Sequence, residues 1–271
     1  MSKVKRESRG VLAAFAALEL GTAGTLIFSI VKRNRMFVFL CFVQAFLLAA
    51  PAIMEKLLSV QLSNPLKIIL MCWIFGCIAL GTIYDFYYKF DFWDLAMHGT
   101  SGFLLTGLGF SLSEMLEPRS DYRPGRFGRI VCAFCFSMAI ASMWELLEYG
   151  IFRIFGRDVQ HDEVLHNFVT SFFTGQDAVS NLIDGITGMT IYTKSGVINV
   201  DGYLDIGFYD TMDDIFAHFV GTALLLLLAV FKKGKYVKAF IPSADFDASP
   251  AIIPCCSTSD PDKNSPANID R

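Results

Sequence analysis

Residues 65–84 read PLKIILMCWIFGCIALGTIY, twenty residues with a single charged side chain, Lys67. A helix needs about 20 mostly apolar residues, at about 1.5 Å each, to cross a hydrocarbon core about 30 Å thick. This stretch is therefore long and apolar enough to cross a membrane as a helix. A proline at position 65 suits the first turn of such a helix, because its missing N–H leaves no hydrogen bond unmade there.

Five further stretches of similar length and character surround this one. We predict that six helices span the membrane, over residues 11–31, 36–53, 65–84, 92–116, 127–152 and 212–231. The composition agrees, because 54% of the 271 residues are hydrophobic and 18% are charged, against about 25% charged in soluble domains. The sequence therefore predicts an all-α membrane protein, a six-helix transmembrane bundle that has the lipid bilayer as its partner.

Charge and hydropathy exclude two other classes of protein. The chain has 23 Lys and Arg against 26 Asp and Glu, a net charge of -3. A nucleic-acid-binding domain carries a basic excess, so we expect no nucleic-acid partner. A mean hydropathy of +0.47 argues against a water-soluble enzyme.

The positions of Lys and Arg predict the orientation, because positive charge stays on the cytoplasmic side of a membrane. With six spans, fourteen of the Lys and Arg residues up to Lys238 fall on the side of the two termini and seven on the other side. We therefore expect a multi-pass cell-membrane protein with both termini in the cytoplasm. Residues 1–10 form the N-terminal segment, residues 11–231 the transmembrane domain, and residues 232–271 a tail whose polar composition predicts disorder.

One long loop, over about residues 156–210, lies outside the membrane in this topology. Its second half reads ITGMTIYTKSGVINVDGYLDI from residue 186 to residue 206. Alternating apolar residues separated by Gly-containing turns are typical of short β-hairpins. We expect a small β-containing external loop between the fifth and sixth helices.

Ionisable residues inside the predicted spans indicate a functional site, because they are costly in lipid. Asp94 and His98 stand four residues apart on the fourth helix, and Asp210, Asp214 and His218 follow one another at four-residue steps on the sixth. Residues at this spacing share one face of a helix. Carboxylate oxygens and imidazole nitrogens are ligands of zinc and transition metals, so we predict that these five residues hold a divalent metal ion of unspecified identity.

Two glutamates on the fifth helix complete the predicted site. Glu145 and Glu148 are three residues apart and share a face near the outer end of that helix. Fifteen of the 26 acidic residues, and all four histidines, lie on or near the same outer side. We expect one of the two glutamates to act as general base if a metal-activated water attacks a lipid-linked ester or phosphate.

Other interpretations stay open from the sequence. Asp210 lies near a helix N-terminus, where the macrodipole favours a carboxylate, and His98 or His218 can each serve as a hydrogen-bonding residue between helices. The same carboxylates suit a cation- or proton-coupled transporter. A non-catalytic membrane sensor or scaffold, whose loop binds a partner, is the third alternative.

At these residues the chain resembles the YjdF-like family of bacterial integral membrane proteins. The matching stretches are YD at 84–85, DFWDLAMHGTSG at 91–102, WELLEY at 144–149, DVQ at 158–160, GYLDIG at 202–207 and DTMDD at 210–214. The resemblance implies a multi-pass bacterial membrane protein and supplies no reaction. Where this chain has His218, the family has an Asn or similar polar residue, so the resemblance favours His98 over His218 as a ligand.

Overall fold

The computed structural model describes residues 8–58, 62–116, 125–156, 159–172 and 180–231. Eight α-helices, one π-helical segment and six short strands make up these residues. The predicted tail over residues 232–271, and most of the predicted N-terminal segment, lie outside the described residues.

The N-terminal half forms one group of helices that pack side by side. These are α1 (Arg9–Val31), α2 (Arg35–Leu48) and α4 (Asn64–Phe75), and α4 continues into the π-helical segment η1 (Gly76–Ile83). A polar side chain caps the start of each: Ser8, Asn34 and Ser63 accept hydrogen bonds from backbone N–H groups of the first turn. Such caps satisfy donors that have no partner within the helix.

The predicted second span is broken near its end. After α2 ends at Leu48, α3 (Ala50–Leu58) continues at an angle of 45°. Pro51 lies in the first turn of α3, and its ring prevents a regular helical hydrogen bond there, which accounts for the bend. Glu55 then ties α3 to the start of α4, because its carboxylate lies 2.7 Å from Lys67 Nζ.

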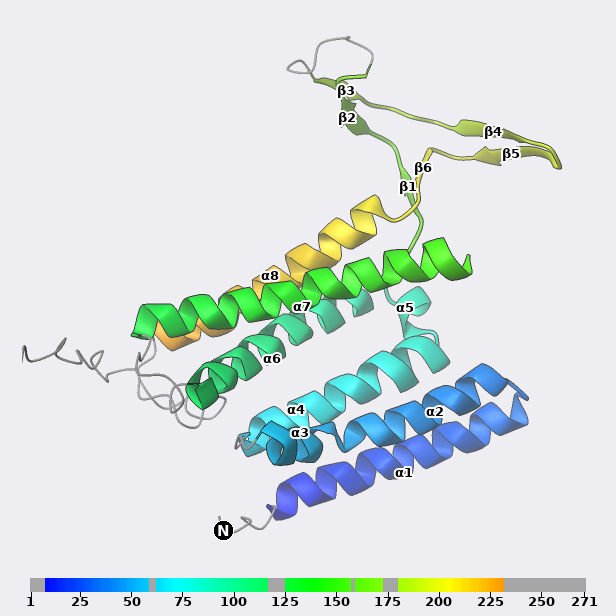
Figure 1. The fold of residues 1–271 in the computed structure, drawn as a ribbon. Coiled ribbons are helices and arrows are strands. Elements are labelled where there is room, and N and C mark those ends of the chain that lie inside the picture. Colours follow the sequence, from blue (N-terminus) through cyan, green and yellow to red (C-terminus); the bar gives the residue numbers. More distant parts are fainter. Residues whose placement is uncertain (1–7, 59–61, 117–124, 157–158, 173–179, 232–271) are drawn as a thin grey trace, which may run out of the picture.

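The C-terminal half forms a second group of three helices, α6 (Trp93–Leu116), α7 (Arg126–Phe155) and α8 (Phe208–Phe231) (Figure 1). A short helix, α5 (Phe86–Lys89), leads into α6. Contacts between α4 and α6 join the two groups, and the indole N–H of Trp73 donates a hydrogen bond to the carbonyl of Met97 across them.

The number of six spanning helices is not confirmed. Among the described residues, α1, α4 with η1, α7 and α8 are long and apolar enough to cross a membrane, and the bent pair α2 and α3 makes a fifth candidate. The predicted fourth span, α6, does not qualify. It carries Asp94 and His98 together with several Gly, Ser and Thr residues, and it packs against α4, α7 and α8, so its polar face meets protein.

Polar side chains lie inside the C-terminal group, and large apolar ones face outward. On α8, Asp214, His218 and Thr222 are buried, whereas Phe216 and Leu224 are more than half exposed. This is the reverse of the soluble pattern and suits a helix whose outer surface meets lipid.

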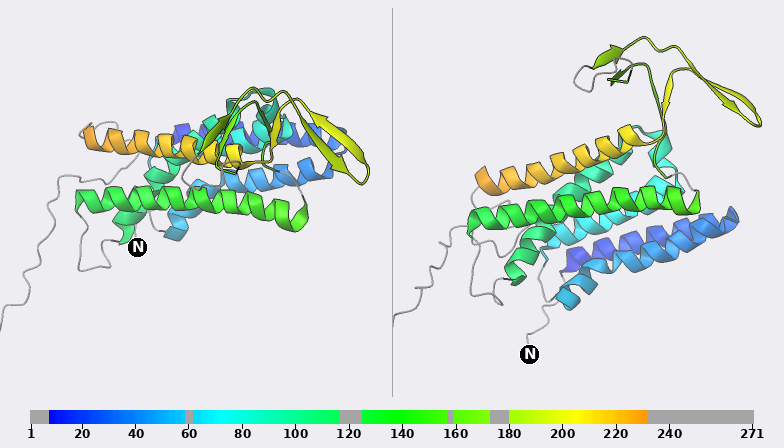
Figure 2. Two further views of the ribbon diagram at one scale, coloured as in Figure 1. Left: turned by 90° about the horizontal axis from the view of Figure 1, so that it is seen from above. Right: turned by 45° about the horizontal axis from the view of Figure 1, so that its top comes forward.

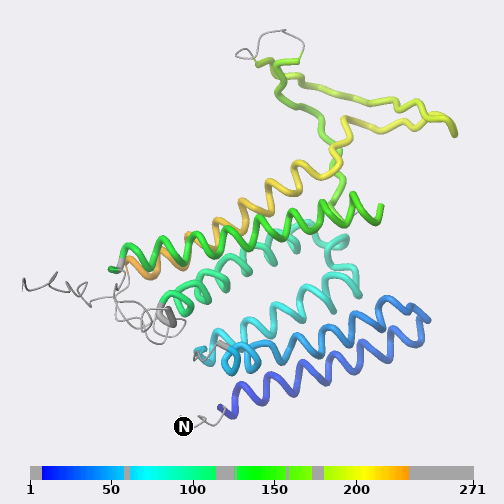
Figure 3. The backbone as a smooth tube through the Cα atoms, viewed as in Figure 1, coloured from blue at the N-terminus to red at the C-terminus, as the bar shows by residue number. Residues whose placement is uncertain are grey.

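Two features mark the opposite ends of the bundle. The start of α1 and the end of α8 lie at one end, while the loop between α7 and α8 projects from the other (Figures 1 and 2). The predicted β-containing loop is present there as three antiparallel pairs: β1 (Glu163–Leu165) with β6 (Tyr203–Asp205), β2 (Phe168–Thr170) with β3 (Asn181–Ile183), and β4 (Met189–Thr193) with β5 (Gly196–Val200). Figure 3 shows the β4 and β5 arm reaching away from the helices.

Candidate metal centre

Glycines bring the backbones of α6 and α8 into direct contact. A Cβ atom on Gly221 would lie 1.8 Å from the carbonyl oxygen of Gly99, and one on Gly102 would lie 2.0 Å from the carbonyl oxygen of His218. No side chain fits at either position, and small residues are what allow membrane helices to approach so closely. The polar faces of α6 and α8 therefore meet at the end of the bundle that carries the β-strands.

A first group of metal-ligand atoms lies between these two helices. His98 Nε2 is 3.5 Å from Asp94 Oδ1 and 3.3 Å from Asp214 Oδ2. One ligand atom from each of Asp94, His98 and Asp214 lies within 4.8 Å of the others. Three ligand atoms at these separations could hold one ion between them.

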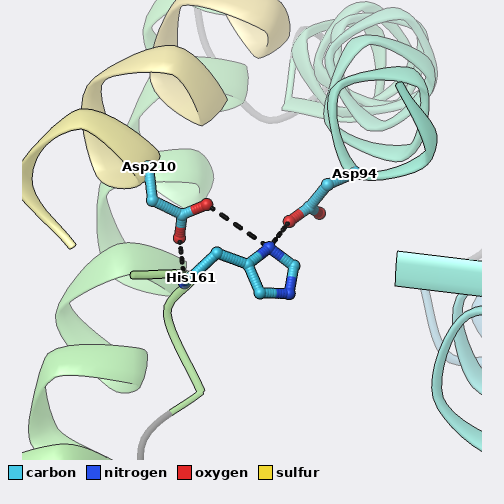
Figure 4. A group of neighbouring side chains, drawn as sticks. All are labelled: Asp94, His161 and Asp210. Atoms are coloured by element: carbon cyan, nitrogen blue, oxygen red, sulfur yellow. Dashed lines mark hydrogen bonds and ion pairs between the residues drawn. The ribbon is translucent and has the colours of Figure 1, made fainter. Parts of the chain in front are cut away.

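A second group adds a histidine from the loop that follows α7. His161 Nδ1 is 3.5 Å from Asp94 Oδ2 and 3.7 Å from Asp210 Oδ1 (Figure 4). The backbone N–H of His161 also donates a hydrogen bond to Asp210 Oδ2, which fixes this loop to the first turn of α8. The ring of Tyr88 on α5 packs edge-on against the imidazole. The loop is thereby held over the ends of α6 and α8.

Both groups border a cavity of about 510 Å³, here called the acidic cavity. Its lining includes seven carboxylate side chains: Asp91, Asp94, Asp162, Glu163, Asp210, Asp213 and Asp214. Among the described residues that line it there is one imidazole, from His161, and no Lys or Arg. Such a concentration of negative charge attracts cations.

The pKa of Glu163 on β1 shows this crowding outside the membrane-spanning segments. Burial raises that pKa above its ordinary value, and the neighbouring carboxylates of Asp213, Asp210 and Asp205 raise it further. A nearby negative charge disfavours ionisation of a carboxyl group. A cation in the acidic cavity would relieve this repulsion.

His218 lies apart from both groups. Its Nδ1 is 2.8 Å from Ser101 Oγ, and its Nε2 is 2.9 Å from Ser137 Oγ on α7. Both ring nitrogens are therefore used in hydrogen bonds that connect three helices, and neither is free to coordinate a metal. His218 thus belongs to neither ligand group, and its contacts agree with its alternative role as a hydrogen-bonding residue.

The two glutamates of α7 also lie outside both groups. Glu148 Oε1 accepts a hydrogen bond from the indole N–H of Trp144. Glu145 is nine-tenths buried, and its Oε2 has no hydrogen-bond partner within the described chain. Its side chain lines a second, mostly apolar cavity of about 610 Å³ between α7 and α8, and Gln160 lies in the wall of both cavities.

The sequence therefore predicted four residues that the structure brings together, Asp94, His98, Asp210 and Asp214. It did not single out His161, although His161 was among the histidines assigned to the outer side. The available signal was its position, a few residues beyond the predicted fifth span. Helical spacing gives no way to connect it with Asp94, which is 67 residues earlier in the chain.

Comparison with known proteins places the chain in a family. Residues 14–235 match the model of the family described as "Predicted membrane protein (DUF2238)". The chain belongs to this family. The match confirms the expectation of a membrane-protein family without a defined reaction, and it covers every helix from α2 to α8 and most of α1.

The other comparisons add little about function. An uncharacterised protein from Thermotoga maritima is 24% identical over 105 residues, which make up 39% of this chain and 53% of that protein. The chain thus spans about half the length of this curated relative. No solved structure matches the chain.

Proposed function

We propose that this protein binds a divalent metal ion between α6 and α8, on the outer side of a cell membrane. The observation that carries the proposal is the convergence of Asp94, His98 and Asp214, whose ligand atoms lie within 4.8 Å of one another. Mixed carboxylate and imidazole ligands suit zinc, manganese or iron.

The cost of burying these groups supports a bound cation. An Asp buried within a membrane-spanning helix is unfavourable unless it is paired, and the Asp214 side chain is only 3% exposed. Two carboxylates beside one imidazole leave an excess of negative charge even when the imidazole is protonated. A divalent ion balances that charge and coordinates all three groups.

We further propose that the bound metal activates a water molecule for hydrolysis of a lipid-linked ester or phosphate. The water oxygen would bond to the acyl carbon or the phosphorus while the bond to the leaving oxygen breaks, and Glu145 or Glu148 would pass the proton of the water to that oxygen. The mostly apolar cavity beside Glu145 supports a lipid substrate, because its lining comes from the last turns of α7 and the first turns of α8, and α8 carries Asp210 and Asp214 in those same turns.

The bend between α2 and α3 gives no support to a transporter function. Transporters bind substrate where their helices are interrupted, near the bilayer midplane. Here α3 and its bend lie toward the end of the bundle where α1 begins, whereas both metal-ligand groups lie toward the other end (Figure 1).

Metal content tests the proposal. Purified wild-type protein should retain about one or more equivalents of zinc, manganese or iron by mass spectrometry, and His98→Ala should lose most of it. Asp184→Asn, in an exposed part of the β-strand loop, is the matched control and should keep the wild-type content. Near-zero metal in the wild type after reconstitution with each ion would refute the proposal.

A second variant separates binding from catalysis. The double variant Glu145→Ala/Glu148→Ala should keep its metal, because neither glutamate belongs to a ligand group, and should lose hydrolysis of lipid esters in vesicles of bacterial lipid extract. Release of free lipid products, followed by mass spectrometry, is the readout. If the wild-type protein holds metal but releases no product from these lipids, the proposal of hydrolysis is contradicted and the proposal of metal binding still stands.

A further inference from the structure

The two oxygens of the Asp94 carboxylate face different histidines. Oδ1 is 3.5 Å from His98 Nε2, and Oδ2 is 3.5 Å from His161 Nδ1. The two groups of ligand atoms therefore share one residue but use opposite oxygens of it. We propose that the acidic cavity holds two divalent cations bridged by the Asp94 carboxylate. This inference rests on the proposed function and adds the number of ions and their arrangement.

The inner ion has Asp94 Oδ1, His98 Nε2 and Asp214 Oδ2 as ligands. The side chains of His98 and Asp214 are 15% and 3% exposed, and His98 does not line the cavity itself. This ion therefore lies between the helices, and we expect it to exchange slowly.

The outer ion has Asp94 Oδ2, His161 Nδ1 and Asp210 Oδ1 as ligands. The side chains of His161 and Asp210 are 28% and 11% exposed, and both line the cavity. The hydrogen bond from the backbone N–H of His161 to Asp210 Oδ2 keeps the other oxygen of Asp210 beside the imidazole. This ion lies nearer the mouth of the cavity, and we expect it to exchange faster.

The charge of the cavity favours two ions over one. Seven carboxylates line it, and none of the described lining residues is Lys or Arg. A single divalent ion in the inner group offsets two negative charges of this lining and leaves the repulsion between carboxylates such as Asp213 and Glu163 in place. The second ion removes that repulsion at the group where His161 and Asp210 already converge.

The sharing of one carboxylate also fits the dimensions of known two-metal sites. Ions in such sites lie about 3.5–4 Å apart, a separation that the two oxygens of one carboxylate can bridge. Each ion here has three protein ligand atoms, which leaves positions open for water or substrate, as in catalytic zinc sites. The open positions of the outer ion face the acidic cavity.

Manganese titration of the full-length protein in detergent tests this inference. The protein is stripped with a chelator, loaded with Mn²⁺, desalted, and analysed for bound manganese per chain, and its electron paramagnetic resonance spectrum is recorded. The wild type should hold two ions per chain with the spectrum of an exchange-coupled pair. His161→Ala should hold one uncoupled ion.

His166→Ala is the matched control, because His166 lies in the same loop and contacts the carbonyl of Ile186 rather than either ligand group. It should behave as the wild type. Asp94→Asn replaces one bridging oxygen with an amide nitrogen, so it should abolish the coupled spectrum even if ions remain.

The outcomes separate this inference from the proposed function. Two ions in the wild type and one in His161→Ala support it. One ion in both proteins would overturn the two-ion arrangement and leave single-metal binding standing. No ion in the wild type would overturn both.

Discussion

His98 and His218 have different neighbours although both lie between helices. His98 lies between the carboxylates of Asp94 and Asp214, whereas His218 lies between the hydroxyls of Ser101 and Ser137. A neutral imidazole between two hydroxyls has both nitrogens satisfied and holds three helices together. An imidazole between two carboxylates has possible ligand neighbours instead, so of these two histidines the proposed metal site uses His98.

Exchanging these two residues for alanine should therefore separate stability from metal content. His218→Ala opens a cavity and leaves the hydroxyls of Ser101 and Ser137 without their partner, which costs about 2–4 kcal/mol of stability. Its melting temperature in detergent should fall while its metal content stays at the wild-type level. His98→Ala should lose most of its metal, while its melting temperature stays near the wild-type value. Equal loss of metal in both variants, at temperatures where both are folded, would contradict this assignment.

Helical spacing could not distinguish these two histidines, because each follows an aspartate by four residues on its own helix. The distinction comes from a neighbouring helix, since Ser137 belongs to α7. His161 was missed for a related reason: its contact with Asp94 depends on how a loop folds back over α6 and α8. Spacing along a single helix carries neither kind of information.

The contact between α6 and α8 positions the ligands, and glycine is essential to it. At Gly221 a Cβ atom would lie 1.8 Å from the carbonyl oxygen of Gly99, which belongs to the helix backbone and has no flexible end that can move aside. Any side chain there forces the two helices apart. Since Asp94 and His98 lie on α6 and Asp214 on α8, the metal-ligand atoms would separate with them.

Gly221→Ala should consequently weaken both folding and metal binding. Overpacking of this kind costs about 1–3 kcal/mol, and we expect metal affinity to fall at least tenfold, which corresponds to about 1.4 kcal/mol. Gly24→Ala, on α1 with open space around the position, is the control and should match the wild type in melting temperature and metal titration. An unchanged affinity in Gly221→Ala would show that the helices need not touch for the site to form.

Most elements were predictable from the sequence, and the exceptions have physical causes. The hydropathy of residues 65–84 located α4 with η1 to within about one residue at each end. Pro51 is present in the predicted second span, but the length of the apolar stretch does not indicate that this proline divides the span into α2 and α3. For α6, the polar residues that lower its hydropathy are the ones that make it the centre of the C-terminal group.

At the scale of the whole molecule, the start of α1 and the end of α8 lie at the end of the bundle opposite to the β-strand loop (Figure 2). From the distribution of Lys and Arg, we predict that the acidic cavity and the β-strand loop lie outside the cell. The sequence predicted a small β-structure in this loop, but the pairing of β1 with β6 brings together residues about forty positions apart and was not predictable from local turns.

Cysteine labelling in intact cells tests this orientation. Ser195 lies in the exposed turn between β4 and β5, so Ser195→Cys should react with a membrane-impermeant maleimide before the cells are lysed. Asn64→Cys, at the other end of the bundle, should react only after lysis, and the wild-type chain gives the background from its own cysteines. The opposite pattern would place the cavity in the cytoplasm.

The most direct test of the metal centre is anomalous scattering from crystals of the full-length protein loaded with manganese or zinc. The account predicts a peak within about 2.5 Å of Asp94, His98 and Asp214, and a second peak near Asp94, His161 and Asp210. Peaks confined to other residues, or flat density between α6 and α8 in crystals shown to contain the metal, would contradict the account.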